Sequence, residues 1–183
     1  MIYPIVLYGD PVLKQKTRDI AKEEYDESLI DDMFETMYSA GGVGLAAPQI
    51  GKPLNLFVID STPMEEDETL GMKEAFINPE IIEEQGNPWG FEEGCLSIPG
   101  IREEVERLPA VKIRYLTKDW DQVTKTFEGV IARIIQHEYD HTRGVLFTDY
   151  LSPLKKRLLK GKLSNISKGK VDAEYRVKVS VKK

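Results

Sequence analysis

The feature that most constrains this chain of 183 residues is the placement of its only two histidines and its only cysteine. His137 and His141 frame the pattern His-Glu-x-x-His, with Glu138 beside the first histidine, in a segment with helical periodicity. Residues four apart share one face of a helix, so two imidazoles at this spacing can bind one metal ion. Cys95 offers a third soft ligand from a distant segment, which leaves one coordination position open, as in a catalytic site. A fold that uses all three must bring the segment around Cys95 against this helix.

The hydrophobic pattern predicts a mixture of helices and strands. Helices are expected at about 26–40, from about 130 to a stop near Gly144, and as a short basic helix at 154–163. Strands are expected at 54–59, 75–78, 80–84, 111–115, 123–127 and 174–181. The acidic stretch 61–73 is expected to be an exposed loop or a hairpin excursion. The mixture favours one α+β domain over 1–183, in which antiparallel sheets pack around a central helix that carries the His-Glu-x-x-His motif.

Composition indicates a soluble globular protein of the cytoplasm, because 41% of the residues are hydrophobic and 31% are charged. One cysteine excludes an intrachain disulfide and favours a reducing compartment. The first residues lack the basic region of a signal peptide. No apolar stretch approaches the roughly 20 residues that span a bilayer, so no membrane partner is expected.

The net charge of −6 is unevenly divided along the chain. The basic C-terminal segment 154–183 holds 11 Lys or Arg and 2 Asp or Glu, for a net charge of +9, and the remainder carries −15. One interpretation is that this segment contacts RNA or another polyanion. The alternative is a solvated basic face that lies against the acidic body.

The histidine pair fits hydrolysis of a carbonyl compound at a metal. Such a reaction needs a metal that lowers the pKa of water, a carboxylate that moves the proton, and donors for the developing oxyanion. Glu138 can supply the carboxylate without binding the metal. A surface helix with two solvated histidines is the alternative. Against it, Val130, Ile134, His137 and His141 follow spacings of four, three and four, so the histidines extend the apolar stripe of the helix.

Three segments together are similar to the signature motifs of a known family. They are Gly42-Val-Gly-Leu-Ala-Ala-Pro-Gln49, Glu93-Gly-Cys-Leu-Ser97 and Gln136-His-Glu-Tyr-Asp-His141, in that order. They resemble the three motifs of the peptide deformylases, which remove the formyl group from the N-terminal methionine of nascent proteins and release formate. The resemblance spans roughly residues 1 to 150, and three ordered motifs are far more specific than any one of them.

The resemblance implies a set of metal ligands and a metal. The matching ligands are Cys95, His137 and His141. The family's metal is ferrous iron, and zinc, nickel or cobalt forms also occur. The residue spacing alone suits zinc equally well, because a thiolate and two imidazoles are also a zinc donor set.

The resemblance also implies the catalytic roles. Glu138 matches the general acid/base, with metal-bound water as the nucleophile. Gln49 matches the side chain that donates to the formyl oxygen, together with the backbone N–H of Leu96. A polar cap on the following strand is the alternative role for Gln49.

Substrate binding is expected between the loop at 42–49 and the cysteine segment, with Gly44 and Gly94 as sites of backbone pairing. The apolar slot for the methionine side chain would be formed by Val43, Leu96, Val130 and Ile134, although the four residues fit a plain core equally well. Arg102 matches a family arginine near the bound peptide. Alternatively, it pairs with Glu103 or Glu104.

Two features depart from the family's pattern. Thr142 follows the last ligand, where a leucine is common, which changes local packing rather than chemistry. The C-terminus lacks the long amphipathic helix of one branch of the family and looks more like the branch whose tail folds back on the sheet. Some members of the family dock on the ribosome through their C-termini, and the charge of +9 on 154–183 would suit that partner.

Two other functions remain open at this level. One is a zinc peptidase that cuts internal peptide bonds, although that class takes its third ligand downstream of the helix. The other is a catalytically idle metal-binding or RNA-binding module. Glu138 and Gln49 speak against it, since a purely structural metal needs neither.

Overall fold

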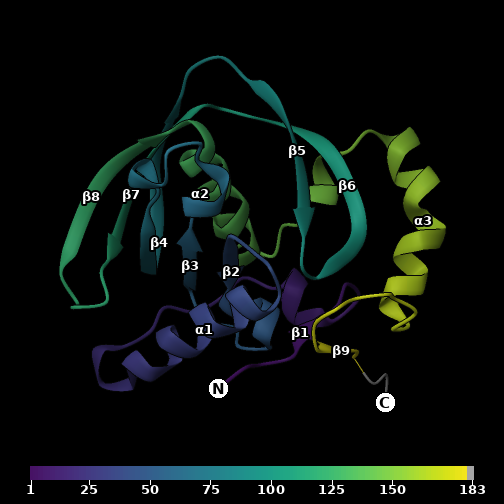
Figure 1. The fold of residues 1–183 in the computed structure, drawn as a ribbon, viewed down its shortest axis with the longest axis horizontal. Coiled ribbons are helices and arrows are strands. Elements are labelled where there is room, and N and C mark those ends of the chain that lie inside the picture. Colours follow the sequence, from purple (N-terminus) through teal and green to yellow (C-terminus); the bar gives the residue numbers. More distant parts are fainter. Residues whose placement is uncertain (181–183) are drawn as a thin grey trace.

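A five-stranded antiparallel sheet forms the centre of the computed structural model, which describes residues 1–180 (Figure 1). In sheet order its strands are β2 (Gly44–Ala46), β3 (Leu56–Asp60), β4 (Lys73–Gln85), β7 (Ala110–Leu116) and β8 (Gln122–Glu128). Strand β2 stands at one end of this order, with β3 as its partner. The outer edge of β2 is therefore not covered by a strand of this sheet.

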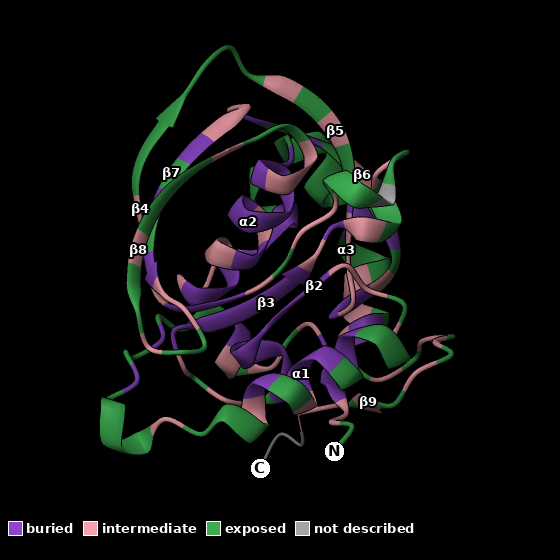
Figure 2. Cartoon of the chain, turned by 60° about the vertical axis from the view of Figure 1, so that its left-hand side comes forward, coloured by how far each residue is buried: buried purple, intermediate pink, exposed green. Residues whose placement is uncertain are grey.

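Both faces of the sheet are covered, as the side chains of strand β3 illustrate. These side chains alternate between the faces, as in any strand. Leu56 and Val58 pack into the core cluster of helix α1 (Glu27–Ser39), whereas Phe57 and Ile59 pack into the cluster of helix α2 (Gly129–Thr142). Figure 2 shows α2 within the curve of the sheet and largely buried. The central helix that carries the histidines is thus held in the middle of the molecule.

A long hairpin stands beside the sheet, next to helix α3 (Pro153–Ser167) (Figure 1). It pairs β5 (Trp89–Cys95) with β6 (Ile98–Arg107) across the turn formed by Leu96 and Ser97. A third core cluster joins this hairpin to the N-terminal segment and to α3. The two-stranded parallel sheet of β1 (Ile5–Val6) and β9 (Val177–Lys178) completes the strands.

Within residues 1–180, six short 3₁₀ segments connect these elements. They are Pro11–Lys14, Lys22–Glu24, Ala47–Ile50, Thr62–Met64, Glu68–Leu70 and Phe147–Tyr150. None of the helices within residues 1–180 combines the length and apolar character needed to cross a lipid bilayer.

The structure confirms the α+β fold with antiparallel sheets around the helix of the His-Glu-x-x-His motif. The helix predicted at 26–40 is α1, and 61–73 is a connection with two 3₁₀ turns that leads into β4. The short helix predicted at 154–163 is longer in the structure. Ser152 caps its N-terminus, and the helix ends at Ser167. The predicted last strand is shorter than 174–181, and Val181 lies outside the described residues.

The two short strands predicted around Pro79 form one strand, β4, and the separation was wrong. The register shifts between Ile77 and Glu80, where Asn78 adopts a positive φ of 50°. The Asn78 side chain holds this irregularity in place, since its amide accepts from the Ile20 N–H at 2.8 Å and donates to the Ile20 carbonyl at 2.9 Å. A β-bulge allows a strand to continue past a proline.

Candidate active site

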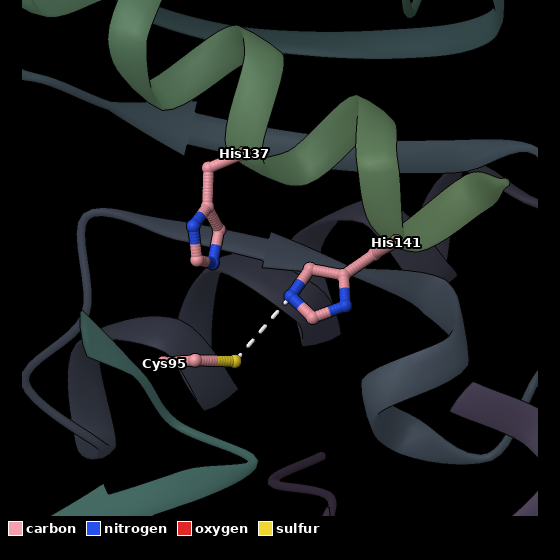
Figure 3. Close-up of side chains that lie close together, drawn as sticks. All are labelled: Cys95, His137 and His141. Carbon is pink, nitrogen blue, oxygen red and sulfur yellow. Dashed lines mark hydrogen bonds between the residues drawn. The ribbon is translucent and has the colours of Figure 1, made fainter. Parts of the chain in front are cut away.

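Three side chains converge where the tip of the hairpin meets helix α2 (Figure 3). Cys95 ends strand β5, and His137 and His141 lie on consecutive turns of α2. Their ligand atoms all lie within 4.8 Å of one another, and Cys95 Sγ is 3.4 Å from His141 Nε2. Three side chains placed in this way could hold a single metal ion.

A buried carboxylate fixes the orientation of His137. His137 Nδ1 donates to Glu93 Oε1 at 2.9 Å, which leaves Nε2 as the ring nitrogen available to a metal. Glu93 also accepts from Arg107 Nε at 2.7 Å and from Arg133 Nη1 at 2.9 Å. Burial alone would raise the pKa of Glu93, but the hydrogen bonds from His137 and Arg107 hold it well below its usual range. Glu93 is therefore an anion at neutral pH.

The network extends away from the three ligands. Arg107 also donates to Asp140 Oδ2 at 2.8 Å, and the Tyr150 hydroxyl donates to the same oxygen at 2.7 Å. Arg133 donates to the backbone carbonyls of Val105 at 2.7 Å and Trp89 at 2.6 Å. These bonds tie α2 to both strands of the hairpin, so the histidines and the cysteine are held by a common set of contacts.

Glu138 lies beside the three ligands but does not join them. Its side chain is buried, and its Oε2 has no hydrogen-bond partner within residues 1–180. Burial is the main cause that raises the pKa of Glu138 to about 7, with the nearby His137 opposing the rise. A buried carboxylate oxygen without a partner is costly. This orphaned oxygen next to a cysteine sulfur and two imidazoles fits a site built around a divalent metal ion and its water.

Gln49 reaches the same place from the short segment Ala47–Ile50 that follows β2. Its Oε1 accepts from the Ala46 N–H at 2.9 Å, which turns the amide nitrogen toward the hairpin. Gln49 Nε2 lies 3.4 Å from Cys95 Sγ and 3.3 Å from Ser97 Oγ. The side chain is thus a buried donor aimed at the tip of the hairpin.

Gly44 makes room for Glu138. A Cβ atom at position 44 would lie 2.4 Å from Glu138 Oε1 and 2.8 Å from Glu138 Cδ. Any side chain at this position would displace the carboxylate, which explains the glycine through close approach rather than through an unusual backbone angle. Because Gly44 is in β2, the glycine also stands on the uncovered edge of the sheet.

An open cleft of about 880 Å³ contains most of the side chains that the sequence singles out. The predicted residues that line it are Val43, Gly44, Gln49, Gly94, Cys95, Leu96, Arg102, Ile134, His137 and Glu138. His141 is buried and is not among the lining residues. Val130 is not among the lining residues and packs against the core cluster of α2.

Arg102 and Thr142 have partners that the sequence did not indicate. Arg102 is exposed and donates from Nε to Glu92 Oε1 at 2.7 Å, rather than to Glu103 or Glu104. Thr142 is fully buried, and its hydroxyl donates to the Tyr139 carbonyl at 2.7 Å. The threonine therefore satisfies its own polar group within the helix.

Sequence reasoning assigned no role to the buried charges Glu93, Arg107 and Arg133. Two signals in the sequence point to them. Arg133 stands four residues before His137 on the buried face of α2, and Glu93 stands two residues before Cys95, so that both point to the same side of their elements. The position of Arg107 depends on the hairpin, which was not predicted.

The chain is similar to proteins of one family throughout its length. The sequence model of the polypeptide deformylase family matches residues 2–157. The peptide deformylase of Cytophaga hutchinsonii is 55% identical, with 100% of both chains covered. That of Christiangramia forsetii is 54% identical, over 97% of this chain and 96% of the relative.

Solved structures show the same similarity. The crystal structure of peptide deformylase from Thermus thermophilus superposes with a TM-score of 0.83 at 38% identity, over 92% of this chain and 99% of that one. The peptide deformylase of Legionella pneumophila gives a TM-score of 0.81 at 38% identity, over 93% and 98% of the two chains.

The fold, the cleft and the cluster of one cysteine with two histidines, together with these relatives, identify a metal-dependent hydrolase. The chain belongs to the polypeptide deformylase family, whose members remove the N-formyl group from nascent peptides. This membership supports a deformylase over the internal peptidase and the idle binding module, which the sequence left open.

Proposed function

We propose that Cys95, His137 and His141 hold one divalent metal ion, expected to be Fe²⁺, and that Glu138, Gln49 and Leu96 carry out deformylation around it. The observation that carries the proposal is the meeting of the three ligand atoms within 4.8 Å at the wall of the cleft. Zn²⁺, Ni²⁺ or Co²⁺ can occupy the same donor set. When bound, the metal supplies a Lewis acid that lowers the pKa of water toward neutrality.

Glu138 is proposed to move the protons of the reaction. It follows His137 directly on α2 and lines the cleft, so its carboxylate faces the cleft without belonging to the ligand set. In this role it accepts a proton from the attacking water and delivers it to the departing amine nitrogen. The products are formate and a peptide with a free N-terminal methionine.

Gln49 and the backbone N–H of Leu96 are proposed to donate to the oxygen of the formyl group as negative charge develops there. Gln49 Nε2 is held in orientation by the bond from the Ala46 N–H to its own Oε1. No acceptor is assigned to the Leu96 N–H among residues 1–180. Donors that are fixed before the reaction stabilise an oxyanion without a cost of reorganisation.

The peptide is proposed to lie in the cleft as an added strand. Strand β2, which contains Gly44, has an uncovered edge, and Gly94 stands across the cleft in β5. An extended peptide can pair with such edges through its backbone, which gives affinity for many sequences. Val43, Leu96 and Ile134 line the cleft and suit the methionine side chain. Arg102 is proposed to lie near the bound peptide.

A ribosome contact through α3 is a further part of the proposal. The helix carries Lys and Arg side chains but no Asp or Glu, and two of its leucines, Leu154 and Leu158, are 64% and 72% exposed. A basic face with exposed leucines suits RNA and the proteins bound to it. The proposed place of action is the cytoplasm, where nascent chains emerge.

The contact is tested by co-sedimentation of the intact protein with ribosomes at increasing salt. The expected result is binding that weakens with salt and is lost in Lys156→Glu/Lys160→Glu, but not in the control Lys22→Glu/Lys112→Glu. Binding that ignores salt, or no binding at all, contradicts the contact.

The catalytic proposal is tested by formate release from a formyl-Met tripeptide, with protein purified anaerobically with ferrous iron. Glu138→Ala is expected to retain one metal per chain and to lose turnover by about a thousand-fold or more. Cys95→Ala is expected to lose the metal and the activity together. Near-normal turnover in metal-loaded Glu138→Ala would contradict the role of Glu138.

A further inference from the structure

The segment that follows helix α3 contributes one side of the cleft. Asp172, Ala173, Glu174 and Tyr175 all belong to the residues that line it, together with the tip of the β5–β6 hairpin. Beyond Tyr175 the chain enters β9 and pairs in parallel with β1, with Ile5 opposite Val177. This part of the chain lies outside the three motifs, and nothing in those motifs assigns it a role.

Tyr175 connects this segment to the turn that carries Leu96. Its hydroxyl donates to the Leu96 carbonyl at 2.7 Å, across 79 positions of the chain. The side chain is partly buried, and both Tyr175 and Leu96 pack against the core cluster of α1. The bond is therefore sheltered by the core that surrounds it, in contrast to a hydrogen bond between mobile surface groups.

The next carbonyl of the turn is held as well. The backbone N–H of Tyr8 donates to the Ser97 carbonyl at 2.8 Å. Tyr175 stands two residues before β9 and Tyr8 stands two residues after β1, and these two strands are paired. Segments from opposite ends of the chain therefore hold the two consecutive carbonyls of the Leu96–Ser97 turn. Two anchored carbonyls leave this turn little freedom to rotate its peptide planes.

We propose that Tyr175 is a positioning residue for deformylation, which fixes the backbone of Leu96 so that its N–H points at the oxygen of the formyl group. This inference rests on the proposed role of the Leu96 N–H. Rotation of the Leu96–Ser97 peptide would change the ψ angle of Leu96 and let the residue turn as a whole. Tyr175 opposes that rotation by holding the Leu96 carbonyl. Because Leu96 then cannot turn, its N–H keeps its direction.

The structure offers a matched control for this hydroxyl. Tyr25 is also partly buried, and its hydroxyl donates to the carbonyl of Lys118 at 2.7 Å. Tyr25 packs against Trp120 and is not among the residues that line the cleft. Tyr25→Phe and Tyr175→Phe thus remove the same type of bond, and Tyr175→Phe alone affects the turn beside Cys95.

The experiment compares the two variants, loaded with metal, in formate release from a formyl-Met tripeptide. Tyr175→Phe is expected to lower kcat by about 3- to 10-fold, the range that loss of one hydrogen bond allows, with KM and metal content unchanged. The amide resonance of Leu96 is expected to shift in Tyr175→Phe. Tyr25→Phe is expected to keep the wild-type kcat and the wild-type Leu96 resonance, while both variants lower the midpoint of unfolding slightly and by similar amounts.

Equal kcat in the two variants would overturn the inference, because Tyr175 would then be structural only. A loss of metal or a rise in KM that accounts for the whole effect would overturn it as well. If the wild-type protein itself releases no formate, the proposed function fails first and this inference fails with it. If the wild type is active and Tyr175→Phe matches it, the inference alone fails.

Discussion

The two walls of the cleft are built in different ways. The first wall is the continuous segment 42–49, which contributes Val43, Gly44 and Gln49. The second wall combines the hairpin residues 91–102 with the segment 172–175, two parts of the chain that lie about 70 positions apart. One wall is thus a local structure, and the other is assembled from distant segments.

The two walls also differ in what holds them. The first wall consists of small and neutral residues, and its decisive feature is space, because Gly44 leaves room for the carboxylate of Glu138. The second wall depends on buried charge, since Glu93 joins Arg107, Arg133 and His137. The glycine of the first wall lets Glu138 come close to the strand. The satisfied polar network of the second wall fixes the orientation of His137.

Loss of the donor in the first wall is expected to have the largest effect among the changes considered for the two walls. Gln49→Leu removes a fixed oxyanion donor, and kcat should fall by about 10²- to 10³-fold while the metal is retained. Formate release together with metal analysis measures both quantities. Gln136→Leu is the control, because Gln136 is a similarly buried glutamine whose amide donates to the carbonyls of Leu108 and Ala132. A similar loss of kcat in both variants would mean that the effect of Gln49 is a general consequence of lost buried hydrogen bonds.

Filling the space in the first wall is expected to have the next largest effect. Gly44→Ala places a methyl group 2.4 Å from the present position of Glu138 Oε1, so the carboxylate must move. A displacement of this size should lower kcat by about a hundred-fold, with the fold and the metal retained. Gly161→Ala is the control, since a Cβ there meets no atom within 4 Å. Wild-type kcat in Gly44→Ala would show that the position of Glu138 is not critical.

A smaller effect is expected from neutralising the second wall. Glu93→Gln keeps the shape of the side chain but removes the anion that two arginines and His137 share. We expect a loss of metal affinity of about 10- to 100-fold and a lower stability, measured by competition with a chelator and by denaturant unfolding. Glu92→Gln is the adjacent control, because Glu92 is exposed and pairs with Arg102 at the surface, where such a pair contributes little. Equal metal affinity in both variants would contradict a role of Glu93 in metal binding.

The same difference between the walls explains what the sequence could predict. The first wall and the helix of His137 were predictable because each is a local pattern of contiguous residues. The β5–β6 hairpin was not predicted, because buried positions of these strands are occupied by charges, among them Glu93 and Arg107. Such residues hide the alternation of apolar and polar side chains that normally reveals a strand.

Tertiary contacts account for the other differences. Strand β4 continues through Pro79 because the side chain of Asn78 bonds to the distant Ile20 backbone. The place of Tyr175 in the cleft depends on the pairing of β9 with β1, two strands of two residues each. No local pattern encodes such contacts, whereas the proposed ligands and Gln49 could be predicted because each of them stands in one of the three motifs.

We propose above all that the tip of the second wall and helix α2 share one metal ion through Cys95, His137 and His141. The most direct test is absorption spectroscopy of the protein loaded with Co²⁺, combined with metal analysis, for the wild type and for Cys95→Ser. The account predicts one ion per chain and a thiolate-to-metal charge-transfer band that disappears in Cys95→Ser. The same band in Cys95→Ser, or a wild-type spectrum without a thiolate band, would contradict the account.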